Sequence, residues 1–504
     1  MKIIKLIPLL NPLILGSFFI LFLYANNLGE GIDFFEVISL FLIVSIFSYS
    51  VFFTSIFIFK NVSKASFYSL VLLFIFYSYG YLYDLLNEIT FISELSRHRF
   101  LIPLIFTLLI LMIFQLVKKD WRLENFHKIF LITFSTLLII NTFTIINSDL
   151  RKSNPLVNNI DINLGQKYKD IPDVYHIVLD MYPTEDILNK RFGFDNSNFI
   201  NELKSMGFRK ENMKSNYMWT SYSIPSTINM THFYNSTPEQ INYMGETHYS
   251  FSKSVEAFYA KNIGYEIHEI STDNIKGFYG YFLGDFSRIF FKTNIIRAVD
   301  DSQLKLHKLW TNIDQKYFNE NINELVNLSK NNKPTWVYFY SRPPHPPFIF
   351  NEDGSKNLVS NPYNEFAEDL SDSWDSEDKL RFIEQLKYVN KTVLESVDKI
   401  LSNSSNSIII IHSDHGIHNY TTYNFNENKN MPKEAYEELF STINFIYSPD
   451  KCIKEDQLIK SNINIISTLF RECFKLNIED KENIQLWNPG SNINEFVIIE
   501  KPGK

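Results

Sequence analysis

Five long apolar segments occupy the first 147 residues, after which the hydropathy falls and stays low. Each segment is close to the ~20 apolar residues that a helix needs to cross the hydrocarbon core of a bilayer. Residues 1–147 are therefore expected to hold the chain in a membrane, and its chemistry is expected in the polar remainder. The predicted spans are 7–24, 35–59, 67–86, 100–117 and 129–146.

Basic residues in the loops alternate between the two ends of the predicted spans. They precede the first span and follow the second and the fourth, whereas the loop 26–33 has no Lys or Arg. Basic loops stay on the cytoplasmic side, so the N-terminus is predicted inside and, after five spans, everything beyond Asn147 outside. The basic residues on the predicted inner side are Lys2, Lys5, Lys60, Lys64, Lys118, Lys119, Arg122 and Lys128.

Several function classes are disfavoured by composition. No span carries a charged residue at mid-membrane depth, which argues against a transporter. The net charge is −8 and no basic block occurs, so nucleic acid is not expected as a partner. No small-residue cleavage site follows the first span, which is therefore expected to be an uncleaved anchor rather than a signal peptide. The two cysteines, Cys452 and Cys473, lack metal-type spacing, and whether they pair is left open.

Three regions are predicted: a five-helix transmembrane domain (1–147), a polar linker (148–172) and an extracytoplasmic domain (173–504). In the last, short β-branched and aromatic runs alternate with longer helical stretches. Near-continuous apolar runs suit buried parallel strands. The alternation predicts an α/β domain, a mostly parallel sheet flanked by helices. The expected strands are 174–179, 265–270, 335–340, 407–412 and 442–447.

Residues suited to metal or phosphate chemistry follow three of these strands. Asp180 ends the first, Asp414 and His415 follow the fourth, and His345 lies in a proline-rich loop after the third. Thr220 belongs to a loop after the first predicted helix. Ligands in such sheets bind beyond the carboxyl ends of the strands, so these residues are expected to converge.

Each residue taken alone has a structural alternative. Asp180 can cap a helix, His345 can shape its loop, and Asp414 can close a turn with His415 as a bystander. Taken together, carboxylates and an imidazole suit a divalent ion, zinc first, with manganese or magnesium possible. Coordination would activate the otherwise poorly nucleophilic hydroxyl of Thr220.

The motifs together resemble those of the alkaline phosphatase/sulfatase superfamily, and most closely its membrane-bound phosphoethanolamine transferases and lipoteichoic acid synthases. Those proteins also carry five N-terminal spans and one outward catalytic domain. The motifs are Leu-Asp180, Thr220-x-x-Ser223-x-Pro225, His345-Pro-Pro-Phe and Ser-Asp414-His415-Gly.

The resemblance implies a role for each matching residue. Thr220 would be both nucleophile and metal ligand, and Asp180, Asp414 and His415 would be the other ligands. His345 would bind substrate phosphate or a second metal. From its position three residues after His415, we also assign His418 to the substrate pocket.

The function expected from this resemblance is a metal-dependent phosphotransferase at the cell membrane. It would move a phospholipid head group, phosphoethanolamine or phosphoglycerol, to a surface glycan or lipid through a phosphothreonine. The chain departs from phosphoethanolamine transferases where Ser226 stands in place of their cysteine after the motif proline.

Two alternatives stay open. A sulfatase would use Ser223 as a modified residue, but the arginine that such enzymes need is Thr227 here, and Met181 replaces a second aspartate after Asp180. The same site could also act as a phosphodiester hydrolase. The second alternative is a non-catalytic membrane protein whose outer domain binds a glycan.

Overall fold

The structure is a computed structural model of the 504-residue chain. It describes residues 2–28, 32–89, 97–150, 154–157, 171–248, 250–272, 280, 282–300, 307–357, 374, 376–418, 431–449, 452–454, 457–487 and 496–499.

Five N-terminal helices are long and apolar enough to cross a membrane, as the sequence predicts. They form a bundle in which α1 packs against α2, α3 and α6. Their apolar side chains face outward over much of their length, as in helices surrounded by lipid. The five are α1 (Lys2–Asn26), α2 (Phe34–Phe59), α3 (Val62–Glu88), α5 (His98–Lys118) and α6 (Glu124–Leu150).

The rest of the chain alternates strands and helices and contains a six-stranded sheet. The strands of the sheet are β1 (Asp173–Leu179), β2 (Arg209–Lys210), β3 (Glu266–Ser271), β4 (Thr335–Ser341), β5 (Ser407–Ser413) and β6 (Asn444–Tyr447); β7 (Gln485–Trp487) and β8 (Val497–Ile499) form a separate pair. The helices are α7 (Glu185–Phe192), α8 (Ser197–Ser205), α9 (Thr220–Asn229), α10 (Pro238–Thr247), η1 (Phe251–Lys253), α11 (Val255–Ile263), α13 (Asp285–Thr293), α14 (Ile296–Asp300), α15 (His307–Leu328), α16 (Ser376–Asn403), α17 (Lys433–Phe440), η3 (Asn462–Asn464) and α18 (Ile465–Phe474).

The sheet has the order β2-β6-β5-β1-β4-β3, so the first strand lies in its centre. β1 pairs in parallel with β4 and β5, and Ile177 lies opposite both Phe339 and Ile411. β3 extends the parallel part, whereas β6 runs antiparallel to β5. The prediction of a mostly parallel α/β sheet is confirmed, and β6 and the short β2 form its antiparallel edge.

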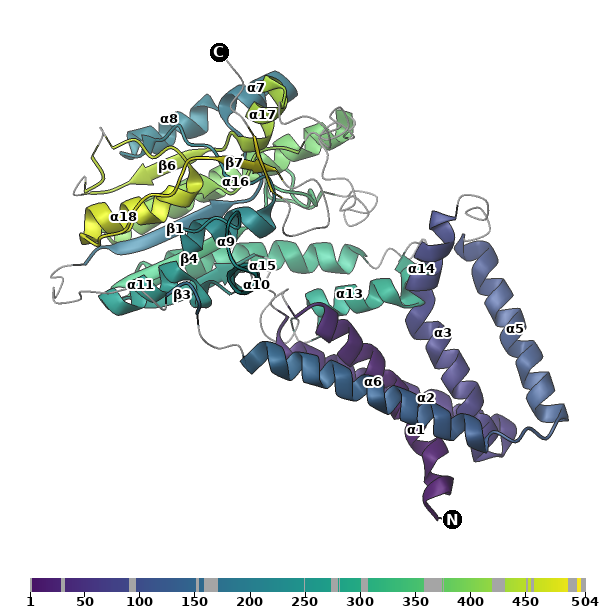
Figure 1. Ribbon diagram of the computed structural model, residues 1–504. Coiled ribbons are helices and arrows are strands. Elements are labelled where there is room, and N and C mark those ends of the chain that lie inside the picture. Colours follow the sequence, from purple (N-terminus) through teal and green to yellow (C-terminus); the bar gives the residue numbers. More distant parts are fainter. Residues whose placement is uncertain are drawn as a thin grey trace. The chain divides into compact units, whose positions relative to one another are not determined.

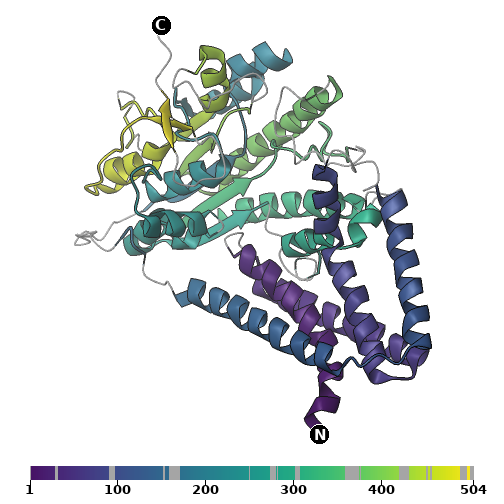
Figure 2. The same ribbon diagram turned by 45° about the vertical axis from the view of Figure 1, so that its right-hand side comes forward.

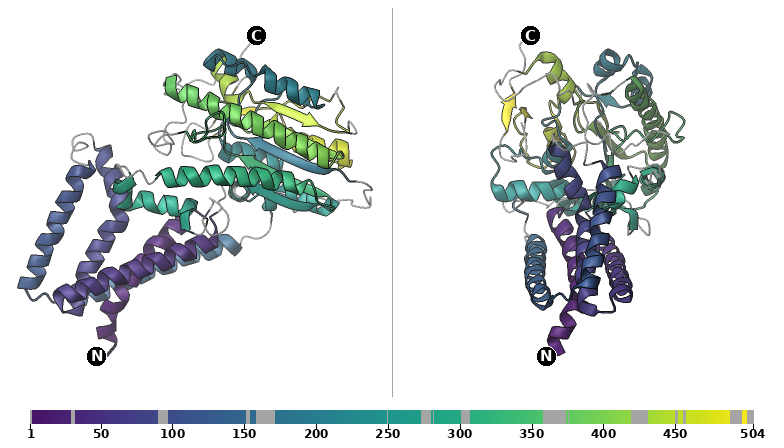
Figure 3. Two further views of the ribbon diagram at one scale, coloured as in Figure 1. Left: turned by 180° about the vertical axis from the view of Figure 1, so that it is seen from behind. Right: turned by 90° about the vertical axis from the view of Figure 1, so that its right-hand side faces the viewer.

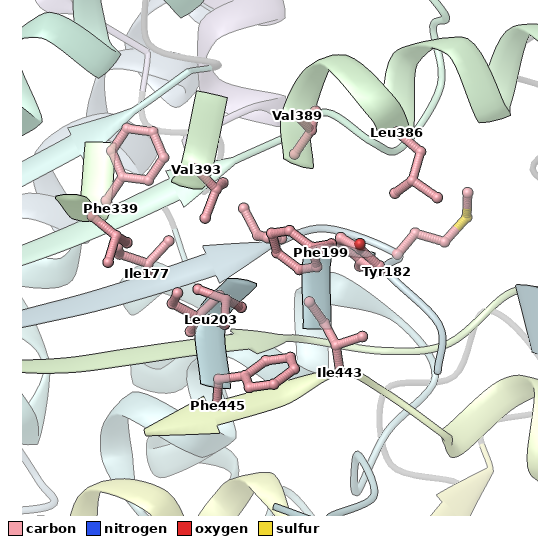
Figure 4. Packing of buried hydrophobic residues seen from close by; sticks show 14 of the residues in the cluster. Ile177, Tyr182, Phe199, Leu203, Phe339, Leu386, Val389, Val393, Ile443 and Phe445 are labelled. Atoms are coloured by element: carbon pink, nitrogen blue, oxygen red, sulfur yellow. The ribbon is translucent and has the colours of Figure 1, made fainter. Parts of the chain in front are cut away.

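Helices cover both faces of the sheet, which explains why its central strands are apolar throughout. Figures 1 and 2 show the strands between two helical layers, and Figure 3 shows α15 and α16 from behind. On that face, α16 places Leu386, Val389 and Val393 over the strands, and α8 adds Phe199 and Leu203 (Figure 4). On the opposite face α9, α11 and α18 pack against Val174, Trp336 and Ile408.

Packing divides the chain into two compact units, and the division differs from the predicted domain boundaries. The first unit contains Met1–Lys152 and also Asn274–Leu306; the second contains Ser153–Asp273 and His307–Lys504. The predicted outer domain 173–504 is therefore interrupted by a segment that packs with the membrane helices. The physical reason is that α13 within this segment buries Phe286 and Phe290 among α1, α2 and α3.

Cys452 and Cys473 form a disulfide with Cα atoms 5.1 Å apart, which answers the pairing that the sequence leaves open. It joins the segment after β6 to α18. Disulfides persist in oxidising compartments, so the bond agrees with the predicted extracytoplasmic location of this part of the chain.

Candidate metal and catalytic site

Three neighbouring parallel strands, β4, β1 and β5, bring the predicted site residues to one edge of the sheet. β1 ends at Leu179, and Asp180 follows it; β5 ends at Ser413, opposite Leu179, and Asp414 and His415 follow. The carboxyl ends of parallel neighbours lie at the same edge, so these side chains meet.

Asp180, Asp414 and His415 form a compact buried cluster. Their nearest ligand atoms all lie within 4.8 Å of one another. His415 Nε2 is 3.3 Å from Asp180 Oδ1 and 3.6 Å from Asp414 Oδ2. The Nδ1–H of His415 donates to the carbonyl of Gly416 (2.7 Å), which leaves Nε2 facing the two carboxylates. This tautomer is the one that a metal-binding imidazole needs.

The hydroxyl of Thr220 joins the cluster. Thr220 Oγ1 lies 3.0 Å from His415 Nε2 and 3.4 Å from Asp180 Oδ1. Thr220 is the first residue of α9, so its side chain is also at the positive end of that helix. From the sequence, Thr220 is expected in a loop, whereas in the structure it begins the helix α9, which forms because Ile224 and Ile228 bury their side chains in the core.

The electrostatics of the cluster suit a bound cation. Burial and the neighbouring Asp180 raise the pKa of Asp414 to about 6. Burial alone would lower the pKa of His415, but the charges of Asp414 and Asp180 raise it to about 9. Both shifts have the direction expected where two buried carboxylates are stabilised by positive charge beside them.

Asp414 supplies an independent test of fit for a metal ion. Its Oδ1 accepts from the backbone N–H groups of Met181 (3.1 Å) and His415 (2.9 Å). Its Oδ2 is buried and has no hydrogen-bond partner among the described residues. A buried carboxylate oxygen is costly unless a donor or a cation satisfies it. The donor set of two carboxylates, one imidazole and one hydroxyl therefore fits a divalent ion.

His345 and His418 lie near this cluster in different settings. The ring centroid of His345 is 6.4 Å from that of His415, and its Nδ1–H donates to the carbonyl of Pro346. His418 is buried, its ring centroid is 4.5 Å from that of His415, and it donates to the carbonyl of Met218, two residues before Thr220. Substrate binding by either residue stays a prediction, and His418 also has a structural contact with the Thr220 segment.

Ser223, the residue that a sulfatase would modify, is turned away from the carboxylates. Its hydroxyl donates to the backbone carbonyl of Asp414 (2.6 Å), and the side chain is buried. Asn462 donates to the preceding carbonyl, that of Ser413 (2.7 Å). Both side chains therefore hold the backbone that carries Asp414.

Two residues near the site were missed from the sequence. The hydroxyl of Tyr340, near the end of β4, donates to Asp180 Oδ2 (2.5 Å). His248 follows α10, and burial lowers its pKa to about 4 although the charge of Asp180 acts in the opposite direction. The signal for Tyr340 was available, because it is next to the end of the strand that leads to His345. Nothing in the sequence around His248 indicates its nearness to Asp180.

A second histidine–carboxylate cluster lies in the core on the same strands. Glu256 of α11 accepts from His176 Nδ1 (2.9 Å) and from Trp336 Nε1 (2.9 Å). His176 Nε2 and His412 Nε2 are 2.8 Å apart, and His412 Nδ1 donates to the carbonyl of Ser413. His412 Nε2 must then accept from the Nε2–H of His176, so the two histidines, Glu256 and Trp336 form one continuous buried hydrogen-bond network.

Comparison with known proteins places the fold in a family. A sequence model described as sulfatase matches residues 176–471. The chain matches no curated protein. Among solved structures, the C-terminal periplasmic domain of EcEptC from Escherichia coli in complex with zinc is 10% identical, with a TM-score of 0.37 over 61% of this chain and 83% of that chain.

Two further solved structures are similar to the chain. The C-terminal periplasmic domain of phosphoethanolamine transferase EptC from Campylobacter jejuni is 15% identical, with a TM-score of 0.35 over 62% of this chain and 92% of that one. Phosphonate monoester hydrolase of Agrobacterium radiobacter is 13% identical, with a TM-score of 0.35 over 63% and 80%. The sulfatase match alone spans more than half of the 504 residues, and the protein therefore belongs to the sulfatase family, as an enzyme of the alkaline phosphatase/sulfatase superfamily.

Proposed function

We propose that the protein is a metal-dependent phosphotransferase that moves a phospholipid head group through a covalent phosphothreonine at Thr220. One observation carries the proposal: the Thr220 hydroxyl, not that of Ser223, lies beside Asp180 and His415. Formylglycine chemistry at Ser223 would need that side chain to face the cluster.

Asp180, Thr220, Asp414 and His415 would hold the metal ion, and zinc is proposed first, with manganese or magnesium as alternatives. Such an ion, when bound, would favour the alkoxide of Thr220 and offset negative charge on the phosphoryl oxygens. The N-terminus of α9 acts in the same direction, because its partial positive charge lies at Thr220.

The reaction would proceed in two displacements. Thr220 Oγ1 attacks the phosphorus of the donor, the bond to the first alcohol breaks, and that alcohol leaves with a proton. A second alcohol then attacks the phosphothreonine and releases the threonine hydroxyl. His345 is proposed to contact the phosphoryl oxygens, and His418 to line the substrate pocket.

The proposed donor is a membrane phospholipid, with diacylglycerol as the first leaving alcohol. The same chain carries five candidate spans, so the enzyme would reside in the membrane that contains such a donor. The proposed acceptor is a surface glycan or lipid. Water in place of the second alcohol would make the same site a phosphodiester hydrolase, which is the alternative function.

Intact-mass measurement of the purified full-length protein tests the covalent step. After incubation with phosphatidylethanolamine or phosphatidylglycerol, one of the two should add the mass of its phosphorylated head group, and peptide mapping should place it on Thr220. A formylglycine at Ser223, or turnover of sulfate esters in preference to phosphodiesters, would replace the transferase proposal with a sulfatase.

The second compact unit, Ser153–Asp273 with His307–Lys504, contains the candidate site and is called the catalytic unit; the first is called the membrane unit. We propose an extracytoplasmic location for the catalytic unit from the charges of the loops. A phosphatase reporter fused after Lys504 should be active, and a reporter that functions only in the cytoplasm should be silent. The opposite pattern would contradict both the topology and a role in modifying a surface molecule.

A further inference from the structure

The chain leaves the catalytic unit after β3 and returns to it at α15, and the segment between, Asn274–Leu306, packs with the membrane helices. Its described part contains α13 and α14 (Figures 1 and 2). The sulfatase fold does not require this packing for its sheet, since both flanking elements, β3 and α15, already pack on β4. The segment therefore needs an explanation of its own.

The first contact is a helix cap provided by a buried acid of α2. Glu36 Oε1 accepts from the backbone N–H of Ser287 (2.8 Å), and Oε2 accepts from that of Phe286 (3.3 Å). These are first-turn amide groups of α13, so the carboxylate also lies at the positive end of that helix. A Cβ atom at Gly284 would be 2.6 Å from Glu36 Oε2, so the glycine permits this close approach.

The second contact is apolar. Phe286 and Phe290 of α13 are buried in one cluster with residues of α1, α2 and α3. The ring of Phe286 lies edge-on to Tyr24 at 6.0 Å, and that of Phe290 is 6.0 Å from Tyr77. The apolar side of α13 is thus covered by the membrane helices themselves.

The third contact runs along the end of α3. The N–H of Ile295 donates to the carbonyl of Phe76 (3.0 Å), and a Cβ atom at Gly80 would be 2.2 Å from the carbonyl oxygen of Lys292. Arg297 pairs with Asp84 (2.8 and 2.9 Å) and lies 4.8 Å above the ring of Tyr83.

All three contacts are at one end of the bundle. They involve the C-terminal ends of α1 and α3 and the N-terminal end of α2, which is the end that the loop charges predict outside. A segment that follows all five spans can reach only that end if the number of spans is odd. The contacts therefore lie at the end of the bundle at which the fifth span, α6, ends.

We propose that the described part of this segment, 282–300, is a clasp: a non-covalent attachment that holds the catalytic unit to the membrane unit independently of the linker after α6. It binds a surface of the membrane helices that consists of three contact residues and three tyrosines: Glu36, Gly80, Asp84, Tyr24, Tyr77 and Tyr83. The clasp combines a capped helix, an apolar contact and an ion pair. These contacts require one particular position of α13 and α14 on the membrane helices, as a specific interface does.

The test separates the clasp from the linker in the full-length protein. A specific protease site is inserted within 158–170 and cut to completion in washed membranes. The fragment that carries the catalytic unit should then still sediment with the membranes, because the clasp remains. Replacing Gly80 with Leu, or Glu36 and Arg297 with Ala together, should increase the released fraction several-fold after the same cleavage.

Controls separate loss of the clasp from loss of folding. Arg99→Ala removes an arginine of α5 that lies over the ring of its own neighbour Phe100, and it should leave the fragment on the membrane. The released fragment of each clasp variant should retain its metal content. Equal release of the cleaved wild type and the Gly80→Leu variant would overturn the proposal, and so would full retention of all clasp variants, since another surface would then hold the fragment.

Discussion

Two buried clusters of histidine and carboxylate use the same strands of the sheet but are balanced in different ways. In the core, both carboxyl oxygens of Glu256 have hydrogen-bond partners within the protein, His176 and Trp336. At the strand ends, Asp414 keeps one buried oxygen without a hydrogen-bond partner among the described residues, and Asp180 lies beside it. The hydrogen bonds of the core cluster are satisfied within the protein, whereas the unpartnered oxygen of Asp414 at the strand ends favours a bound cation. The residue types in the two clusters are similar, and the clusters differ in whether each buried polar atom has a hydrogen-bond partner.

The largest effect should come from removing the proposed nucleophile of the end cluster. Thr220→Ala should lower transfer or phosphodiester cleavage by on the order of 10⁴-fold or more, the scale expected when a covalent nucleophile is lost. Thr220→Ser should keep part of the activity because the hydroxyl remains. Ser223→Ala, assayed in parallel with a chromogenic phosphodiester, should cause a smaller loss, and equal losses at the two positions would show that the hydroxyl roles are misassigned.

The metal requirement of the end cluster can be tested by neutralising Asp414. Asp414→Asn keeps the oxygen that accepts from Met181 and His415 but removes the charge that a divalent ion needs. Bound metal, measured by elemental analysis, should be lost, and activity with it. In the presence of a chelator the variant should unfold at the same temperature as the wild type or higher, because repulsion from Asp180 is relieved. Full metal content in an active variant would contradict the proposed ligand set.

The core cluster should show the opposite behaviour. Glu256→Gln replaces a buried carboxylate that both His176 and Trp336 contact, and the disrupted hydrogen bonds should lower the free energy of unfolding by about 1–3 kcal/mol. Metal content and activity per folded molecule should stay close to wild type. Thermal unfolding of the purified protein in detergent, alongside elemental analysis, measures both. A variant that loses metal but not stability would place the functional site in the core instead.

The smallest effect is expected at the contact that Tyr340 makes with the end cluster. Tyr340→Phe removes one hydrogen bond to the Asp180 carboxylate, worth about 1.5 kcal/mol, so the dissociation constant for metal should rise roughly 10-fold. Competition with a chelating dye measures this constant. Tyr388→Phe, which removes a hydrogen bond to Asn319 on α15, is the matched control and should not change it.

The sequence alone determined the parts of this protein that depend on local composition. Five apolar runs of membrane-spanning length predict five helices, and the β-branched runs predict the five main strands of the sheet, because burial on both faces demands apolar residues throughout. Asp180, Asp414 and His415 were found for a related reason. Parallel strands bring whatever follows them to one edge, so position after a strand is enough to predict convergence.

Tertiary structure decided what depends on contacts distant in sequence. The apolar residues of β6 do not determine its direction, since a parallel and an antiparallel strand can have the same composition. Pro225 argues against a helix at Thr220, yet α9 forms because its apolar side chains are buried against the sheet. Ser223 and Thr220 carry similar hydroxyls, and only the fold turns one to a backbone carbonyl and the other to the carboxylates.

The segment with α13 is the clearest case. Its nine residues are amphipathic and too short to cross a membrane, so the sequence indicates an apolar surface to be covered but not which surface covers it. The fold supplies the partner more than 200 residues earlier in the chain, where Glu36 caps the helix and Gly80 leaves room for it. Local sequence determines elements and their buried sides, whereas the choice of partner depends on geometry that exists only once the chain is packed.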